Sequence, residues 1–207
     1  MTEAAHQMTS NPLPTNGPRY PGSVGKGMGV SVRILDGKGN ELPHDIQGEI
    51  CIRGPNVTPG YLNNPAANTS SFYPNGYFRT GDMGTIDAAG YVRITGRIKE
   101  MINRGGEKIA PVELDNVLAS HPAVAEAVCF ALESELYGQE VGAAVVLKEG
   151  KKASEGELKG WLGERVAKFK VPKRVWFTEV MPKTATGKVQ RRMVAEEMVK
   201  RNQKAKL

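Results

Sequence analysis

The hydrophobic pattern of the chain changes its period near Gly96, and this change limits the folds that the sequence can adopt. Before this point, apolar and polar residues alternate in short runs between glycine-bearing turns, which is typical of antiparallel strands. These runs are residues 30–36, 48–54, 83–87 and 91–95. Beyond Gly96, apolar residues also recur at helical spacing. The sequence therefore predicts an α+β protein in two parts, a β-rich part over residues 1–96 and an α+β part over residues 97–207.

The second part is expected to alternate helices with strands. Pro111 starts a first helix, which ends before Pro122. Ser154 and Glu157 form a capping box that opens a second helix, and a last helix is expected from about residue 190. The side chains expected to face the core are Leu114, Val117, Leu118, Leu158, Trp161, Leu162 and Val166. The expected strands are residues 124–132, 140–148 and 173–180.

The charge distribution bears on the kind of partner. The net charge is +6, and most of the excess falls after residue 150. Few aromatic residues accompany these basic residues to stack on bases, so a site for a polyanionic small molecule fits as well as nucleic acid does. We expect no nucleic-acid partner. We also expect no membrane span, because no apolar run is long enough, and residues 1–20 lack the pattern of a signal peptide.

The two cysteines, Cys51 and Cys129, lie far apart in strand-like apolar runs. A buried unpaired cysteine behaves as a small apolar side chain. We therefore expect two buried free thiols, which fits a reducing or non-secretory compartment.

A Gly-Lys pair, Gly187-Lys188, stands on a threonine-flanked turn before the basic last helix. A phosphate-binding loop of the form G-x-x-x-x-G-K-[ST] is excluded, because Pro182 occupies the first glycine position and Val189 replaces the hydroxyl residue. Lys188 is instead a candidate cation on a flexible turn, suited to stabilising charge that develops on a phosphoryl or carboxylate oxygen. The alternative is a surface lysine without a chemical role.

Three other segments each suit one part of a nucleotide. Asp82 follows a glycine turn at a strand end, where its carboxylate can accept hydrogen bonds from both ribose hydroxyls; an ordinary turn is the alternative. Residues 96–111 carry several charges around Gly105-Gly106, and can also be a solvated hairpin whose glycines permit a tight turn. Thr2 and Glu3 supply a hydroxyl and a carboxylate, the kind of pair that holds a phosphate and its Mg²⁺; an ordinary N-terminal tail is the alternative.

In this order, the segments resemble the carboxyl-terminal part of the adenylate-forming superfamily of acyl-CoA synthetases, luciferases and peptide-synthetase adenylation domains. The similar segments are residues 1–3 (MTE), 48–61 (GEICIRGPNVTPGY), 77–82 (YFRTGD), 96–113 and 182–188 (PKTATGK). Within the superfamily, the amino-acid sequence looks most similar to the oxalate–CoA ligase branch, over residues 56–68, 102–115 and 169–192. The resemblance covers nearly the whole chain.

The resemblance implies roles for residues of the first part. Thr2 would contact the nucleotide phosphate and Glu3 would bind Mg²⁺. Asp82 would hold the ribose, and Arg97 would contact the ribose or the phosphate. His6 lies three residues beyond Glu3 and is a candidate for the acyl pocket, where it could pair with a second substrate carboxylate; a solvent-exposed histidine is the alternative.

The resemblance also implies roles for the second part, as a small mobile lid. Lys99 would be the hinge residue. Gly105 and Gly106 would line the pantetheine path of coenzyme A, where a side chain would block the thiol. Lys188 would bridge the substrate carboxylate and the α-phosphate of ATP.

The function implied is that of an ATP-dependent acid–CoA ligase acting through an acyl-adenylate, with ATP, Mg²⁺, coenzyme A and a small carboxylic acid such as oxalate as reactants. The superfamily's phosphate loop and most of its acyl pocket lie upstream of the segments found here, so we expect a carboxyl-terminal fragment of such a ligase. The alternative is a non-catalytic module, either acting in trans or decayed.

The terminal residues Ala205-Lys206-Leu207 resemble the S-K-L signal for peroxisomes. They indicate a peroxisomal location and a peroxisomal import receptor as a partner. A chain end without a targeting role, and with it a cytoplasmic location, is the alternative.

Overall fold

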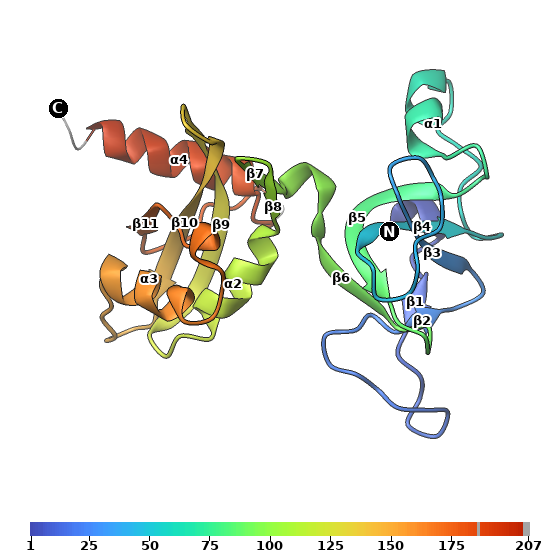
Figure 1. Cartoon of the computed structure of the whole chain (residues 1–207), viewed down its shortest axis with the longest axis horizontal. Helices are drawn as coiled ribbons and strands as arrows, with labels where there is room; N and C mark the ends of the chain where they lie inside the picture. Colours follow the sequence, from blue (N-terminus) through green and yellow to red (C-terminus); the bar gives the residue numbers. More distant parts are fainter. Residues whose placement is uncertain (186, 205–207) are drawn as a thin grey trace. The chain divides into compact units, whose positions relative to one another are not determined.

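The computed structural model describes residues 1–185 and 187–204, with side chains as far as residue 201. Two compact units follow one another along the chain: unit 1, residues 1–99, and unit 2, from residue 100 onward. Figure 1 colours them from blue to green and from green to red. Both strands and helices are present, and the predicted α+β class is confirmed. The assignment of unit 1 to a larger nucleotide-binding domain and of unit 2 to a mobile lid remains a prediction.

Unit 1 is built on a four-stranded antiparallel sheet in the order β3-β4-β5-β6. Its strands are β3 (Ser31–Leu35), β4 (Gly48–Arg53), β5 (Phe78–Ile86) and β6 (Val92–Arg97). Its smaller elements are η1 (Thr2–Ala4), the paired β1 (Thr9–Ser10) and β2 (Lys26–Gly27), and α1 (Pro65–Ser71). All four predicted strands are present. The strand predicted at 83–87 begins earlier, at Phe78, so that Asp82 lies within β5.

Helix α1 was not predicted, although its start carries a recognisable signal. The side chain of Asn64 accepts a hydrogen bond from the backbone N–H of Ala67, and Pro65 takes the first helical position. Asn before Pro at a helix start supplies both an N-cap acceptor and a preset backbone angle.

Unit 2 has a five-stranded sheet in the order β11-β10-β7-β8, with β9 also paired to β10. Its strands are β7 (Ile102–Arg104), β8 (Glu107–Ile109), β9 (Val124–Ser134), β10 (Gly138–Leu147) and β11 (Arg174–Phe177). Its helices are α2 (Pro111–Ala119), α3 (Glu155–Gly163) and α4 (Arg191–Lys204), with the short η3 (Lys168–Lys170). The short η2 (Ile98–Glu100) spans the boundary between the two units. β10 and β11 are parallel, and the other pairs are antiparallel.

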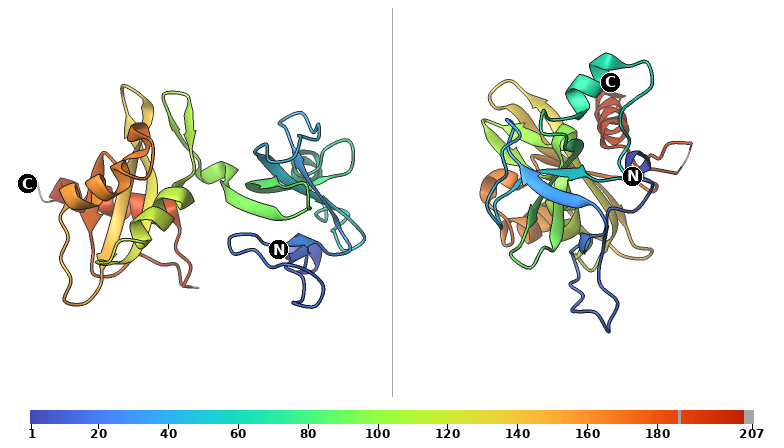
Figure 2. Two further views of the ribbon diagram at one scale, coloured as in Figure 1. Left: turned by 60° about the horizontal axis from the view of Figure 1, so that its bottom comes forward. Right: turned by 90° about the vertical axis from the view of Figure 1, so that its right-hand side faces the viewer.

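The alternation of side chains along β9 and β10 gives this sheet two buried faces. Cys129 and Val141 lie in one hydrophobic cluster with leucines of α2 and α3. Val128 and Phe130 lie in another, which includes Val194 of α4. The sheet is therefore sandwiched between α2 and α3 on one side and α4 on the other (Figure 1, Figure 2).

The predicted caps and core positions of unit 2 are largely confirmed. The side chain of Ser154 accepts a hydrogen bond from the N–H of Glu157 at 3.1 Å, as the capping-box pattern indicated. Leu158 and Leu162 of α3 are fully buried. Val166 also packs against the core, but it lies beyond the end of α3 at Gly163, so its placement on that helix was wrong.

Both cysteines are free and buried, as predicted. Burial raises the pKa of the Cys51 thiol to about 12, with a further contribution from Glu49, and raises that of Cys129 well above its ordinary value. In the part of the chain that the structure describes, no helix combines the length and the apolar character that crossing a membrane requires.

Candidate functional site

The Thr80-Gly81-Asp82 turn interrupts the regular pairing of β5. Gly81 has φ +73°, a left-handed conformation that favours glycine. The hydroxyl of Thr80 donates to the carbonyl of Ile50 at 2.7 Å and accepts from the N–H of Asp82 at 3.1 Å. Three consecutive residues are thus fixed to one another and to β4.

Asp82 and Arg97 face each other as register partners on β5 and β6. The guanidinium Nε of Arg97 donates to Oδ1 of Asp82 at 2.7 Å. The side chain of Asp82 is 21% exposed and that of Arg97 is 64% exposed. Two residues predicted to contact the nucleotide are therefore adjacent, and Oδ2 of Asp82 accepts no hydrogen bond from the residues that the structure describes.

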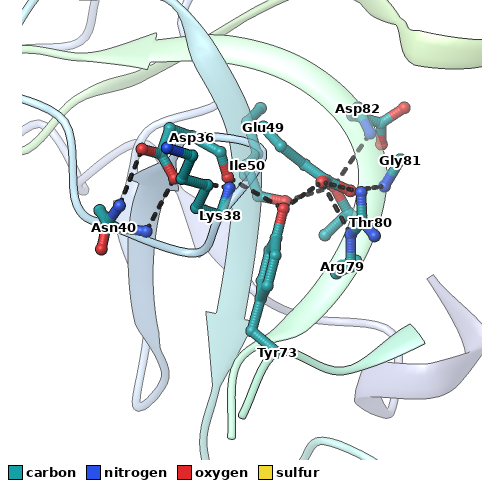
Figure 3. A network of polar contacts seen from close by, with 10 residues as sticks. All are labelled: Asp36, Lys38, Asn40, Glu49, Ile50, Tyr73, Arg79, Thr80, Gly81 and Asp82. Atoms are coloured by element: carbon teal, nitrogen blue, oxygen red, sulfur yellow. Dashed lines mark hydrogen bonds and ion pairs between the residues drawn. The ribbon is translucent and has the colours of Figure 1, made fainter. Parts of the chain in front are cut away.

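A buried carboxylate, that of Glu49, lies between Tyr73 and this turn (Figure 3). Glu49 of β4 is only 5% exposed, and its Oε2 accepts from Nε and Nη2 of Arg79, both at 3.0 Å. Its Oε1 accepts from the backbone N–H of Gly81 at 3.2 Å. The hydroxyl of Tyr73 lies 3.3 Å from Oε2, and burial followed by the charge of Glu49 raises the pKa of Tyr73.

Glu49 was not among the residues predicted from the sequence. The available signal was a single carboxylate in the apolar run Gly48–Ile52, where β4 is buried on both of its faces. A charged residue at a doubly buried position requires a partner, and the sequence did not identify Arg79 as that partner.

The proposed metal ligand Glu3 lies in η1 and is held by the segment that follows β4. Its carbonyl accepts from the N–H of Thr58 at 2.7 Å, and its Oε1 accepts from the hydroxyl of Tyr61 at 3.1 Å. Tyr61, whose pKa is raised by burial and by Glu3, is a second residue that sequence reasoning missed. Thr2 and His6 are exposed, and His6 adopts a left-handed φ of +71°.

The residues present fit one mode of magnesium binding, in which the protein supplies few of the ligands. No group of three or more His, Cys, Asp or Glu side chains suited to a metal occurs among the described residues. Mg²⁺ that is bound through one or two carboxylates, waters and substrate phosphates requires no such group. The half-buried carboxylate of Glu3 is suited to that role.

Lys99 is the last residue of unit 1, and its side chain is exposed within η2. Unit 2 begins with Glu100. The hinge residue implied by the resemblance thus stands where the two units join, and its role as a hinge remains a prediction.

Gly105 and Gly106 form the turn between β7 and β8, with φ values of +58° and +97°. The N–H of Gly105 donates to the carbonyl of Tyr137 at 2.9 Å, and the guanidinium of Arg104 lies 3.9 Å from the centre of the Tyr137 ring. A Cβ added to Gly106 would meet no atom within 4 Å. Within unit 2, Gly106 is therefore required by its backbone angle, while the space beside it remains open.

Lys188 is exposed at the end of a loop that closes on itself. The N–H of Lys188 donates to the hydroxyl of Thr184 at 3.1 Å, and its carbonyl accepts from the N–H of Thr184 at 2.8 Å. Gly187 has φ +77°. No acidic side chain among the described residues pairs with Lys188, so its ammonium group is available to a ligand.

Arg191 is the first residue of α4 and the partly buried centre of an ion network in unit 2. Its side chain is 17% exposed, and it donates to Oε2 of Glu100 at 2.8 Å and to the carbonyl of Cys129 at 3.0 Å. It also pairs with Oδ2 of Asp115 at 2.7 Å. Burial raises the pKa of Asp115 although Arg191 opposes this shift. Arg191 therefore joins α4 to the start of unit 2, to α2 and to β9.

Two cavities differ in their relation to these residues. A small cavity of about 130 Å³ in unit 1 is lined mainly by apolar side chains together with Thr80 and Asp82. An open hollow of about 560 Å³ in unit 2 is lined by His121, Glu157 and Trp161 among others, and by none of the candidate site residues. The first cavity adjoins the candidate site, because Asp82 lines it. The tail Ala205-Lys206-Leu207 lies outside the described residues.

Comparison with known proteins agrees with the resemblance seen in the sequence. Residues 1–62 match the AMP-binding enzyme family, and residues 113–188 match the AMP-binding enzyme C-terminal domain. The chain is 52% identical to the oxalate–CoA ligase of Arabidopsis thaliana over 97% of its own length and 39% of that protein. It is 55% identical to the oxalate–CoA ligase of Saccharomyces cerevisiae, over 97% of this chain and 37% of the relative.

Solved structures give the same result. The ATP-bound MatB from Rhodopseudomonas palustris is 38% identical, with a TM-score of 0.88 over 95% of this chain and 39% of that one. The o-succinylbenzoate coenzyme A synthetase MenE from Bacillus subtilis, in complex with AMP, is 35% identical with a TM-score of 0.83, over 94% of this chain and 39% of that one. The chain thus spans less than half the length of these relatives.

Proposed function

The chain belongs to the AMP-binding enzyme family of the adenylate-forming superfamily, and we propose that it forms the carboxyl-terminal portion of an ATP-dependent acid–CoA ligase. The reaction joins a carboxylate to the α-phosphate of ATP with release of pyrophosphate, and the thiol of coenzyme A then displaces AMP from the acyl group. Oxalate is the acid we propose, because oxalate–CoA ligases of two organisms are more than half identical to this chain.

The observation that carries the proposal is the arrangement around Asp82. A carboxylate on a turn that requires glycine, braced by Arg97 at 2.7 Å and with its second oxygen free of hydrogen bonds from the described residues, can accept hydrogen bonds from the two hydroxyls of a ribose. In the proposed reaction Asp82 binds the ribose, and Arg97 orients Asp82 and contacts the ribose or the phosphate. Thr2 contacts the phosphate, and Glu3 binds the Mg²⁺ that accompanies it.

In the proposed adenylation step, the substrate carboxylate attacks the α-phosphorus and pyrophosphate leaves. The exposed ammonium of Lys188 stabilises the negative charge that develops between the carboxylate and the α-phosphate. In the second step, the thiol sulfur forms a bond to the acyl carbon and AMP leaves. We propose that unit 2 rotates about Lys99 between the two steps. The rotation removes Lys188 from the active site and brings the Gly105-Gly106 turn to it.

A chimera tests the proposal directly. In the Arabidopsis thaliana oxalate–CoA ligase, the 201 residues that match this chain are replaced by their counterparts from this chain. With oxalate, ATP and coenzyme A, the chimera is expected to release pyrophosphate and to form oxalyl-CoA. The control is the Arabidopsis protein without the replaced segment, which should form neither product.

The same assay, run with oxalate and with other small acids, tests the choice of substrate and the role of His6. Oxalate should be preferred to a monocarboxylate of similar size, and His6→Ala should raise the KM for oxalate more than that for the monocarboxylate. Equal effects on the two acids would remove His6 from the acyl pocket. A chimera that folds but forms no acyl-CoA would contradict the ligase proposal and favour a non-catalytic module.

We propose a peroxisomal location, supported by the terminal Ala205-Lys206-Leu207. Residues 190–207 fused to a fluorescent reporter should direct it to peroxisomes, and removal of Leu207 should leave it in the cytosol. A diffuse signal from the intact segment would contradict this location.

A further inference from the structure

Glu49 is a buried carboxylate that the proposed mechanism does not use. It is only 5% exposed in the middle of the unit 1 sheet, and an isolated charge at such a depth is strongly disfavoured. Its partner Arg79 satisfies the charge through two contacts of 3.0 Å, and this ion pair alone accounts for the burial. It does not account for the position of the other carboxylate oxygen.

The two oxygens of Glu49 have different partners (Figure 3). Oε2 receives both nitrogens of Arg79 and lies 3.3 Å from the hydroxyl of Tyr73. Oε1 receives the backbone N–H of Gly81 at 3.2 Å. One oxygen therefore holds side chains, and the other holds the backbone of the turn that presents Asp82.

The turn also depends on this bond because of its backbone conformation. Gly81 adopts φ +73°, and the Cβ position of this glycine has no atom within 4 Å. No side chain crowds Gly81 from that side. Apart from the pairing of Asp82 with Arg97 on β6, the contacts that fix the turn are the Glu49 bond to Gly81 and the hydroxyl of Thr80. Because Asp82 follows Gly81 directly, its direction depends on this peptide unit.

We propose that Glu49 is a positioning residue for nucleotide recognition: through Gly81 it orients Asp82 toward the hydroxyl groups of the ribose. This inference rests on the proposed function and assigns a role to a residue outside the candidate site. The substrate feature that it governs is the ribose 2′-hydroxyl, because a displaced Asp82 no longer reaches both hydroxyls.

The substitution Glu49→Gln isolates this role. A glutamine has one accepting oxygen and one donating amide group, whereas both positions at Glu49 face donors. The charged Arg79 takes the remaining oxygen, and the amide group then faces the N–H of Gly81, so two donors meet. Relief of this conflict displaces the turn and, with it, Asp82.

The experiment compares ATP with 2′-deoxy-ATP in the chimera, measured by pyrophosphate release. For Glu49→Gln, the KM for ATP is expected to rise roughly tenfold, as for one buried donor left without its acceptor. The preference for ATP over 2′-deoxy-ATP, as a ratio of kcat/KM values, is expected to fall roughly fivefold to tenfold. The reason is that 2′-deoxy-ATP has no 2′-hydroxyl and so has no hydrogen bond from that group to Asp82 to lose.

Tyr73→Phe is the matched control. It removes the contact with Oε2 and leaves the bond from Oε1 to Gly81, so it should leave the preference unchanged even where it lowers stability. If Glu49→Gln lowers kcat/KM equally for both nucleotides, Glu49 serves the fold alone and the inference is overturned. An active wild-type chimera is the condition for this result, and an inactive one overturns the proposed function together with the inference.

A second pair of variants covers a failure of Glu49→Gln to fold, which would appear as rapid thiol labelling of the otherwise buried Cys51. Thr80→Val removes the hydroxyl that fixes the N–H of Asp82, whereas Thr80→Ser retains it. The valine variant should lose the preference for ATP and the serine variant should keep it. Equal preferences in the two variants would contradict the positioning of Asp82 by this turn.

Discussion

Each unit of the molecule contains a buried charge close to a candidate loop, but the two charges are used differently. In unit 1 the buried anion Glu49 bonds directly to the backbone of the turn that carries Asp82. In unit 2 the partly buried cation Arg191 lies three residues beyond Lys188, and its partners are Glu100, Asp115 and the carbonyl of Cys129. Its contacts thus hold the base of the loop and leave Lys188 outside the network.

This difference matches the tasks proposed for the two loops. A residue that binds the ribose must keep one position, and a carboxylate fixed through its own backbone has little freedom to move. A cation that serves only one of two steps must leave the site between them. At its tip the loop of Lys188 is closed by hydrogen bonds between Thr184 and Lys188, and at its base it is anchored by Arg191. The comparison predicts a rigid anchor in unit 1 and a movable cation on a rigid base in unit 2.

The largest effect is expected from Arg191→Met, which leaves two acidic side chains without their cation. Loss of one member of a buried ion network costs about 3–5 kcal/mol of unfolding free energy. The loss should be confined to unit 2, whose unfolding is reported by the fluorescence of Trp161 and Trp176, the two tryptophans of the chain. Labelling of Cys51 in urea reports unit 1 and should keep its midpoint.

The control is Arg192→Met, since Arg192 is 91% exposed and, among the residues that the structure describes, forms an ion pair with Glu196 one turn away. It should change the stability of unit 2 by less than about 0.5 kcal/mol. If Arg191→Met lowers the midpoints of both units equally, the units unfold together and the comparison between them breaks down.

Lys188→Ala should have the next largest effect, on chemistry and not on folding. In the chimera, adenylation should slow by about 10²–10³, equivalent to roughly 3–4 kcal/mol of transition-state stabilisation. Conversion of supplied acyl-adenylate and coenzyme A to the thioester should proceed at a near-normal rate, because Lys188 acts only in the first step. Single-turnover assays of each half-reaction measure both rates.

Lys152→Ala, an exposed lysine elsewhere in unit 2, serves as the control and should leave both half-reactions unchanged. Equal losses in the two half-reactions of Lys188→Ala would show that Lys188 is not exchanged between the steps. No loss in either would make it a surface lysine.

Gly106→Leu should give a smaller effect, limited to the second step. The added side chain fills the open space beside the β7–β8 turn, and thioester formation should fall roughly tenfold or more, while adenylation is retained. The backbone strain of a left-handed non-glycine residue, about 1–2 kcal/mol, appears as lost stability.

Gly150→Leu is the control for backbone strain, because Gly150 also has a positive φ, +68°, with open space at its Cβ position. It should lose similar stability in urea and retain both half-reactions. If Gly106→Leu loses adenylation and thioester formation together, the glycine serves the backbone and the pantetheine path lies elsewhere.

The smallest effect concerns Glu155, at the start of α3. Burial raises the pKa of its carboxyl, but the hydrogen bonds from Lys159 and from the N–H of Val175 outweigh this and lower it below the ordinary 4.5. An acid whose pKa is lowered by folding stabilises the folded state above its unfolded pKa, and this contribution is lost as the pH falls below 4.5. The side chain is 40% exposed, so screening limits the contribution to below about 1 kcal/mol.

Tryptophan fluorescence in urea from neutral pH to pH 3 should show this loss for the wild type, and a smaller one for Glu155→Gln. Glu164→Gln, which alters a more exposed carboxylate of the same unit, should follow the wild type. Identical pH profiles for the wild type and Glu155→Gln would remove Glu155 from the acid response of unit 2.

Local chemistry made much of the molecule predictable from the sequence. Gly81, Gly105, Gly106 and Gly187 were assigned to turns, and all four adopt positive φ values. Strand alternation and the Ser154 cap were also recognised, because period and capping depend on residues within a few positions of one another. The order of the motifs identified the superfamily for the same reason, since each motif is a short run of the chain.

What the tertiary structure alone decided is which distant groups meet. Glu49 and Arg79 are 30 residues apart, Glu3 and Tyr61 are 58 apart, and Glu100 and Arg191 are 91 apart. With 28 basic and 22 acidic residues in the chain, spacing does not indicate which ones pair. The pairing follows from sheet register and from burial, because a charge removed from water must find whichever opposite charge the packed strands and helices place beside it.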